Sequence, residues 1–80
     1  MTQALPQATG RLLVATDGVV ARVLVDGRPK AESPATLDGV PIGTHTVELE
    51  AEGFTRWRGD VTVREGKPTY LDVSLRKVHR

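Results

Sequence analysis

The chain has no cysteine among its 80 residues, so neither a disulfide framework nor a thiolate metal site is available to it. Asparagine is absent as well, which removes every N-glycosylation site. Aromatic residues are scarce, with one Trp, one Tyr and one Phe. A domain of this size buries only about 60% of the surface that its unfolded chain exposes. We therefore expect every aromatic side chain to be needed for packing, and no large enclosed active site.

Neither sign of charge is in excess. Lys and Arg number 11, Asp and Glu number 10, and the formal net charge is +1. Non-specific binding to a phosphate backbone needs a basic excess, so we expect no nucleic-acid partner. No apolar run approaches the ~20 residues that span a bilayer, and residues 1–7 lack the charged and apolar regions of a signal peptide. We expect a soluble segment that carries no targeting signal and does not insert into a membrane.

Short runs of alternating apolar and polar residues are the dominant pattern. They recur roughly every 8–12 residues with turn signals between them, which predicts a β-sandwich or barrel. No segment has helical periodicity over three turns. The expected strands are residues 11–16, 19–25, 44–52, 61–64 and 69–76. Period two assigns these residues to the inner faces: Ala21, Val23, Val25, His45, Val47, Leu49, Ala51, Val61, Val63, Leu71, Val73 and Leu75.

Residues 28–43 contain three prolines and two glycines, too many breakers for a central strand. Within them, Ala35-Thr36-Leu37 could form a short edge segment. The ends of the chain differ from its middle. Residues 1–9 are polar and without periodicity, which predicts a linker or frayed end, residues 10–76 form the domain, and residues 77–80 are a basic tail.

Several motifs occur in a fixed order along the domain. They are Val23-Leu24-Val25 followed by Asp26-Gly27, the corner Ser33-Pro34, the strand start Gly43-Thr44-His45, the turn Gly53-Phe54, and Val61-Thr62-Val63 followed by Gly66. Together they resemble the PEGA domain, a small all-β module of bacterial and archaeal surface and signalling proteins. The resemblance covers about Gly10 to Arg76. The tetrapeptide that names the family is the main departure, since Gly18-Val-Val-Ala21 stands there and only its alanine agrees.

The resemblance implies a small Greek-key β-sandwich, similar to transthyretin-like and immunoglobulin-like modules. Family members look like non-catalytic accessory domains of envelope proteins and of bacterial serine/threonine kinases, often in tandem. In this family type, His45 is expected to hydrogen-bond loop backbone near Leu37 to Gly39. The structural motif residues implied by the resemblance are Asp26, Gly27, Pro34, Gly39, Gly43, His45, Gly53, Phe54 and Gly66.

No arrangement in the sequence indicates catalysis, a metal or a cofactor. The histidines, His45 and His79, have no ligand spacing, and the first is better explained as a structural residue of a strand start. The carboxylates of residues 48, 50 and 52 share one strand face, which we interpret as a solvated, edge-protecting face. Three Asp-Gly dipeptides fit no calcium-loop spacing, and turn formation explains them.

The candidate partner surface comprises Arg56, Trp57, Arg58 and Tyr70. Straight period-two counting places Trp57 on the core face, whereas a bulge at Gly59 would turn it outward beside the two arginines. An exposed Trp with flanking Arg would be a natural hot spot for binding. Tyr70 lies on the outward face of the last strand. The tripeptide Arg58-Gly59-Asp60 leads straight into a strand, which argues against an integrin-type loop.

Three functions are compatible with these features. The first is a non-catalytic interaction domain of a larger bacterial envelope or kinase-signalling protein, which binds a protein or a cell-envelope component, with strand edges available for β-augmentation. The second is a carbohydrate or cell-wall binding module with Trp57 or Tyr70 as stacking platform. The third is a structural spacer or assembly unit, in tandem or self-associating through sheet edges. The family context favours an extracytoplasmic location, with a cytoplasmic one as the alternative.

Overall fold

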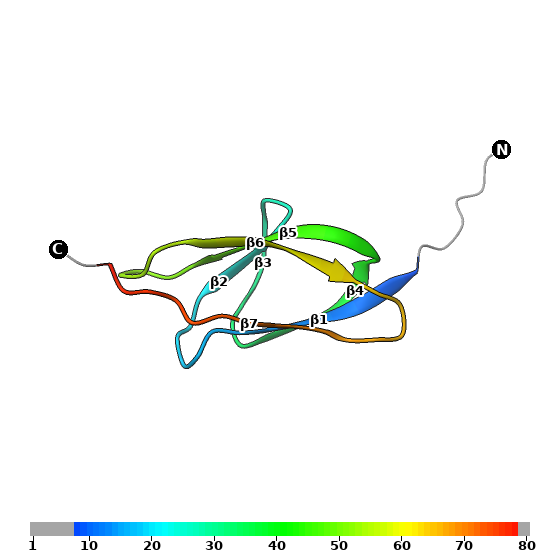
Figure 1. Ribbon diagram of the computed structural model, residues 1–80, viewed down its shortest axis with the longest axis horizontal. Helices are drawn as coiled ribbons and strands as arrows, with labels where there is room; N and C mark the ends of the chain where they lie inside the picture. The colour runs from blue at the N-terminus through cyan, green and yellow to red at the C-terminus, as the bar shows by residue number, and fades with distance from the viewer. Residues whose placement is uncertain (1–7, 79–80) are drawn as a thin grey trace.

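The computed structural model describes residues 8–78, which contain seven β-strands and no helix. The strands form a three-stranded sheet of order β4-β1-β7 and a four-stranded sheet of order β3-β2-β5-β6, packed face to face (Figure 1). The prediction of a small all-β sandwich is confirmed. The strands are β1 (Thr9–Ala15), β2 (Arg22–Val25), β3 (Arg28–Glu32), β4 (Ala35–Pro41), β5 (Gly43–Glu50), β6 (Trp57–Val63) and β7 (Thr69–Asp72).

The structure describes only part of the predicted linker (residues 1–9) and of the predicted basic tail (residues 77–80). Of the linker, Ala8 and Thr9 are described, and Thr9 already belongs to β1. Of the basic tail, Lys77 and Val78 are described, and Lys77 pairs with Phe54 in an isolated bridge. The remaining residues of both predictions, including His79, lie outside the described range.

The core is built from small aliphatic side chains on the inner faces of both sheets. Period-two alternation identified most of it, since Val23, Val47 and Leu49 are fully buried. Ala51, Leu71 and Leu75 are half-buried against the core. The complete set of buried apolar residues is Leu12, Val14, Ala21, Val23, Val25, Val40, Val47, Leu49, Val61, Val63 and Val73.

The prediction that residues 28–43 contain no central strand is confirmed, but the segment forms two edge strands where only a short edge segment at residues 35–37 was expected. Both strands lie at sheet edges, β3 beside β2 and β4 beside β1. A proline lacks the N–H that a central strand needs on both sides, but an edge strand tolerates it. Each strand also has a register irregularity, at Lys30 in β3 and at Asp38-Gly39 in β4. Breakers in sequence therefore indicated an edge, not the absence of a strand.

Two other expected strands are shorter in the structure. The strand expected over 19–25 begins at Arg22, and the one expected over 69–76 ends as a strand at Asp72. The chain nevertheless keeps its alternation after Asp72, since Val73 is buried while Asp72 and Ser74 are exposed. The alternation of apolar and polar residues thus correctly predicted which side chains point inward after Asp72, where β7 has already ended.

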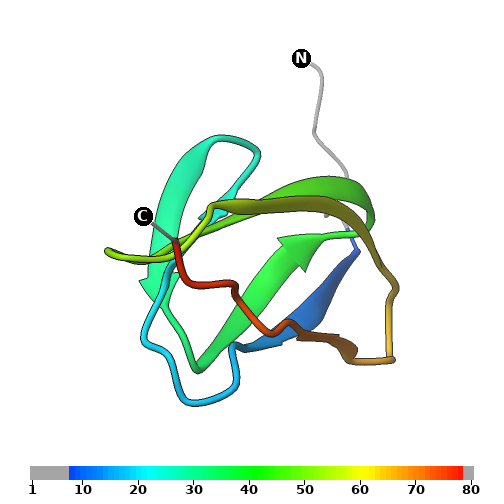
Figure 2. The same ribbon diagram turned by 60° about the vertical axis from the view of Figure 1, so that its left-hand side comes forward.

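One side of the sandwich is closed by the chain that runs from β6 to the C-terminal segment (Figure 2). The Thr69 hydroxyl donates to the Thr62 carbonyl at 2.9 Å, at the turn between the two strands. At the far end, Thr55 N–H donates to the Arg76 carbonyl at 2.8 Å, and Val78 N–H donates to the Gly53 carbonyl at 3.0 Å. All three hydrogen bonds fit one antiparallel alignment of the chain segments before and after the β6–β7 turn. Between these bonds, β7 leaves that alignment and pairs with β1 instead.

Two buried hydroxyl groups fix the corner where the chain crosses from β3 to β4. Thr16 and Ser33 are each 2% exposed, and their hydroxyl oxygens lie 2.5 Å apart. Ser33 Oγ also accepts the Ala21 N–H at 2.9 Å, and both hydroxyls lie in hydrogen-bond contact with the Val19 carbonyl. Pro34 follows Ser33 through a cis peptide bond. Every buried side-chain oxygen and nitrogen in the described range has a partner, as burial in a small core requires.

The substitution Ser33→Ala is expected to lower the free energy of unfolding by about 1–3 kcal/mol, because it leaves the buried Ala21 N–H without its acceptor. Urea denaturation of the two proteins measures the difference. Ser74→Ala is the matched control, since Ser74 is exposed and its one hydrogen bond, to Asp17, is 3.5 Å long. Equal losses in both variants would contradict the role given to the buried corner.

Candidate functional site

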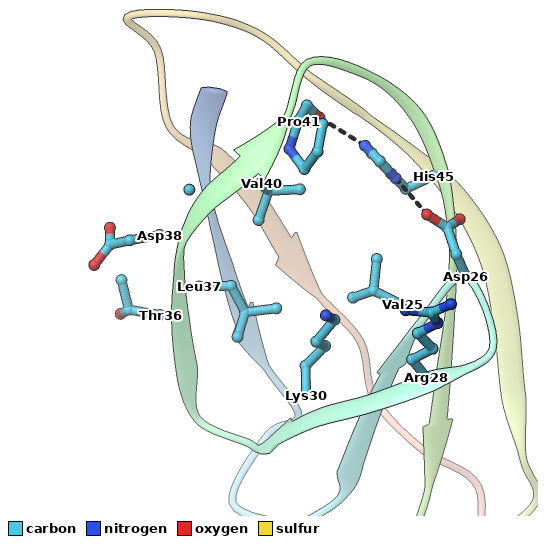
Figure 3. Close-up of a pocket in the computed structure, with 11 residues that line it drawn as sticks. Val25, Asp26, Arg28, Lys30, Thr36, Leu37, Asp38, Val40, Pro41 and His45 are labelled. Atoms are coloured by element: carbon cyan, nitrogen blue, oxygen red, sulfur yellow. Dashed lines mark hydrogen bonds and ion pairs between the residues drawn. The ribbon is translucent and has the colours of Figure 1, made fainter. Parts of the chain in front are cut away.

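A cleft lies between the edge strands β3 and β4, on the side of the sandwich opposite the one closed by β6 and the C-terminal segment. This cleft has a volume of about 540 Å³. Its lining comes from the β2–β3 hairpin, from β4 and from the start of β5 (Figure 3). The cleft exists because the chain crosses between the sheets at Ser33 and the two strands then diverge, with no other strand between them.

The floor of the cleft is apolar. Val25 and Val40 are buried residues of the core, and Leu37 is half-buried beside them. Leu37 pairs with the fully buried Leu12 of β1, which places its side chain on the inner face of the three-stranded sheet. An apolar side chain that entered the cleft would therefore extend the existing core.

Two cations from β3 lie over this floor. Arg28 pairs with Val25 across the β2–β3 hairpin, so its side chain leaves the same face as a buried valine, toward the interior of the sandwich. Lys30 stands at the register irregularity of β3, and Figure 3 shows its side chain extending into the cleft. Neither residue forms an ion pair within residues 8–78. The cleft thus combines an apolar floor with two cations, of which Lys30 is near enough to Asp26 to help lower the pKa of that carboxyl without forming an ion pair with it.

The carboxylates nearest to the cleft are engaged elsewhere. Asp38 of β4 lies 2.7 Å from Arg11 Nε, a residue of the outer face of the same sheet. Figure 3 shows the Asp38 side chain directed away from the floor. Asp26, at the end of the cleft, is held by His45. Arg28 and Lys30 therefore form no ion pair with either of the carboxylates that line the cleft.

His45 closes one end of the cleft by joining three segments. Its Nδ1 lies 2.6 Å from Asp26 Oδ2, and its Nε2 lies 2.6 Å from the Pro41 carbonyl oxygen. Asp26 also accepts the Thr46 N–H through Oδ1 at 3.1 Å. The hairpin Val25-Asp26-Gly27-Arg28 presents this carboxylate because Asp26 and Gly27 both have positive φ, 52° and 81°. We call Asp26, His45 and Pro41 the histidine latch.

The latch stabilises the charged imidazolium. A carbonyl oxygen and a carboxylate are both acceptors, so a ring that bonds to both must donate from each nitrogen. The hydrogen bond to Asp26, followed by the one to Pro41, raises the pKa of His45 above its ordinary 6.5, although partial burial acts against this. The hydrogen bond from His45, followed by the one from Thr46, lowers the pKa of Asp26 below its ordinary 3.8. His45 was expected to hydrogen-bond loop backbone near Leu37 to Gly39, but its backbone partner is the carbonyl of Pro41, further along the same strand.

The other motif residues occupy corners and turns of the sandwich rather than one site. Phe54 is half-buried at the pole opposite the latch, where it bridges to Lys77. The remaining ones are Pro34 at the β3–β4 corner, Gly39 in the β4 irregularity, Gly43 at the start of β5, Gly53 in the β5–β6 turn and Gly66 in the β6–β7 turn.

The four residues of the candidate partner surface do not share one face. Trp57 is half-buried against the core, and the β5–β6 register runs without a shift from Leu49↔Trp57 to Gly43↔Val63. Trp57 therefore points toward the core, as straight period-two counting predicts, and no bulge at Gly59 turns it outward. Its indole lies over Gly59, where an added Cβ would come within 2.6 Å of the ring. Arg58 alternates to the outer face, and Tyr70 lies on the other sheet.

The interpretation of the acidic strand face needs correction. Glu48 and Glu50 are half-buried and pair with Arg56, with an Arg56 Nη1 to Glu48 Oε2 distance of 3.7 Å and a closer contact to Glu50. β5 lies between β2 and β6, so its carboxylates protect no sheet edge. Period two located the face correctly, but only the strand order reveals that it is central.

Tyr70 belongs to a second, shallower surface. It is 72% exposed and pairs with Leu13 of β1, which in turn pairs with Thr36 of β4. These side chains share the outer face of the three-stranded sheet, where a depression of about 360 Å³ is lined also by Pro34 and Asp72. An exposed ring beside hydroxyl and carboxylate groups suits an apolar or sugar surface.

Sequence reasoning missed Arg28 and Lys30. The Asp26-Gly27 turn held the signal for Arg28, because a two-residue hairpin places its flanking residues opposite each other, on one face. The same signal extends to Lys30, because it lies two positions after Arg28 and alternation places both side chains on one face.

The sequence model of the PEGA domain family matches residues 9–79, nearly the whole chain. No curated protein matches it. No helix long and apolar enough to cross a membrane occurs within residues 8–78. In the same range, His, Asp and Glu side chains form no group of three that could hold a metal ion.

Replacing Gly59 by Ala is expected to lower the free energy of unfolding by about 1–3 kcal/mol, because the new methyl group overlaps the Trp57 ring and forces it outward. Denaturant titration followed by tryptophan fluorescence reports both the stability and the exposure of the ring. In a Trp57→Ala background the same substitution should cost much less. An unchanged cost in that background would show that backbone effects, not the ring, are responsible.

The stability of the domain should depend on pH through the histidine latch. Because folding raises the pKa of His45, its contribution is complete below about pH 6.5 and is lost as the pH rises through the folded-state pKa. Because folding lowers the pKa of Asp26, its contribution is complete above about pH 3.8 and is lost as the pH falls through its folded-state value. Urea denaturation from pH 5 to 9 should show a decline that begins at about pH 6.5.

His45→Gln should abolish that decline, whereas His79→Gln, which changes the other histidine, should leave it intact. Proton NMR titration of the two histidine rings gives the pKa of His45 directly. Parallel stability curves for the wild-type protein and His45→Gln would contradict the latch.

Proposed function

Because the chain belongs to the PEGA domain family, we propose that it is a non-catalytic interaction module of a larger bacterial protein, and that it binds a partner protein through the cleft between β3 and β4. The observation that supports this most is the cleft itself, an uncovered apolar floor under two cations without ion-pair partners in the described range. The proposed setting is an envelope or kinase-signalling protein, with the extracytoplasmic side favoured.

The sheet edges offer less to a partner strand than the cleft does. β3 contains Pro29 and a register irregularity, and β4 contains an irregularity and ends at Pro41. Prolines and irregularities are the features by which natural edge strands avoid further pairing. The outer carbonyl of Thr62 on β6 is already bound by Thr69. Docking of side chains into the cleft is therefore favoured over β-augmentation.

A non-catalytic role agrees with the state of the most reactive side chain. Both ring nitrogens of His45 are bonded to acceptors, so the ring has no free lone pair with which to act as a base. The hydroxyl groups of Thr16 and Ser33 are buried at the β3–β4 corner and bonded to each other and to backbone. In neither group is a nucleophile placed beside a base.

The exposed ring of Tyr70 favours a second candidate function, carbohydrate or cell-wall binding. Its outer sheet face presents an aromatic ring, an aliphatic neighbour in Leu13 and polar groups in Thr36 and Asp72. A sugar ring could stack on Tyr70 while its hydroxyls bond to the polar groups. This face is separate from the cleft, so the two functions can be tested independently.

Affinity capture with the immobilised chain tests the two candidates together. Cytosolic, membrane and cell-wall fractions of a bacterium that encodes PEGA domains are applied, and retained proteins are identified by mass spectrometry, while sacculi are tested by sedimentation. We expect one defined protein to be retained equally by the wild-type chain and by Tyr70→Ala. Hydrogen exchange of that complex should show protection over residues 25–41.

Other outcomes would decide against the proposal. Sedimentation with sacculi that is lost in Tyr70→Ala would support the carbohydrate function instead. Retention of nothing in any fraction would leave a structural spacer or assembly unit as the function.

A further inference from the structure

We infer that the ligand of the cleft is an extended acidic peptide segment of a protein partner, whose carboxylates pair with Arg28 and Lys30 and whose apolar side chain rests on the floor formed by Val25, Leu37 and Val40. This inference rests on the proposed function and specifies its ligand class. Within residues 8–78, this cleft combines an apolar floor with two cations that form no ion pair.

The sign of the ligand charge follows from the ion pairs of the domain. Asp38 is bound to Arg11 and Asp26 to His45, so both nearby carboxylates already have cationic partners. Arg28 and Lys30 have none in the described range. A carboxylate ligand can form paired hydrogen bonds with the guanidinium of Arg28 and a further bond with the ammonium of Lys30. A basic or neutral segment would leave both cations desolvated without a partner.

The spacing of the cations favours a peptide over a small anion. Arg28 and Lys30 lie two positions apart in sequence, on the edge strand that forms one wall of the cleft. An extended peptide places alternate side chains on one face at similar intervals of ~6–7 Å. Acidic residues at alternate positions of such a segment can therefore reach successive cations. Side chains that point the other way can reach the apolar floor.

The shape of the cleft is set before a ligand arrives. The Ser33 corner fixes the end where β3 and β4 meet, and the histidine latch fixes the opposite end by linking Asp26 to Pro41. Rigid walls reduce the ordering cost of binding. A short segment can consequently bind with useful affinity in a site this small.

Charges directed inward from an edge strand also discourage edge-to-edge association of sheets. This alternative accounts for the cations without a ligand, and it makes a different prediction. Removing both charges, as in Arg28→Gln/Lys30→Gln, would then leave any peptide binding unchanged and would promote self-association, which sedimentation velocity detects.

The test is selection of random displayed peptides of about nine residues on the 80-residue chain, followed by calorimetry with synthetic copies of the enriched peptides. We expect the enriched peptides to share acidic residues near an apolar one. Binding of such a peptide should weaken at least tenfold in Arg28→Glu/Lys30→Glu and should weaken as salt concentration rises. Amide resonances of Leu37 and Val40 should shift on binding.

Arg64→Glu/Lys67→Glu is the matched control, because it makes the same change of charge at exposed residues of the β6–β7 turn that do not line the cleft. It should bind the peptide as the wild-type chain does. Circular dichroism and thermal denaturation establish that both double variants are folded. Equal binding by the two double variants would overturn the inference.

The results separate failure of this inference from failure of the proposed function. Enriched peptides that are apolar or basic, yet shift the cleft resonances, would overturn the acidic ligand while supporting a docking cleft. Peptides that shift only residues around Tyr70 would overturn the inference and assign binding to the outer sheet face. A selection that enriches nothing would overturn the inference, and the capture experiment would then decide alone whether the domain binds a protein.

Discussion

The buried hydrogen bonds between Thr16, Ser33 and the Val19–Ala21 backbone hold the architecture together. The core has only small aliphatic side chains and no fully buried aromatic, so few contacts besides these fix how the strands cross between the sheets. A buried hydroxyl without a partner is costly, which ties the corner to one geometry. Because β3 and β4 are joined at this point and lie in different sheets, they must diverge from it, and the cleft is the space that results.

The sequence was sufficient for the fold class and for most of the core, because period-two alternation is a local property of the chain. It located the faces of the strands that contain Val23, Val47 and Val61. Strand order is not local: the prolines and glycines of residues 28–43 indicated edge segments, but nothing in the chain's alternation shows which strands they flank or that β5 is central. The cleft depends on that order, so its residues could not be brought together in advance. The role of His45 as a structural histidine was foreseen, but not its ion pair with Asp26, which lies 19 residues earlier.

Charge is distributed differently over the two sides of the molecule. On the outer face of the four-stranded sheet, Arg56 forms ion pairs with both Glu48 and Glu50. At the latch, Asp26 neutralises the His45 imidazolium. Exposed ion pairs contribute little stability individually, so their arrangement is informative chiefly for what it leaves unpaired. With a net charge of only +1, the chain places two cations that form no ion pair within residues 8–78 over an apolar depression.

The parallel pairing of β1 with β7 has a mechanical consequence. The two ends of the described chain lie at opposite poles of the molecule (Figure 1). β1 leads in from one pole, and β7 leads out toward the other. Tension applied through the flanking chain would pull the two strands along their length in opposite directions, loading the pairs from Leu12↔Thr69 to Ala15↔Asp72 in shear. Hydrogen bonds loaded in this way must break together instead of one after another. The β1–β7 pairing therefore resists extension along the axis between the two poles.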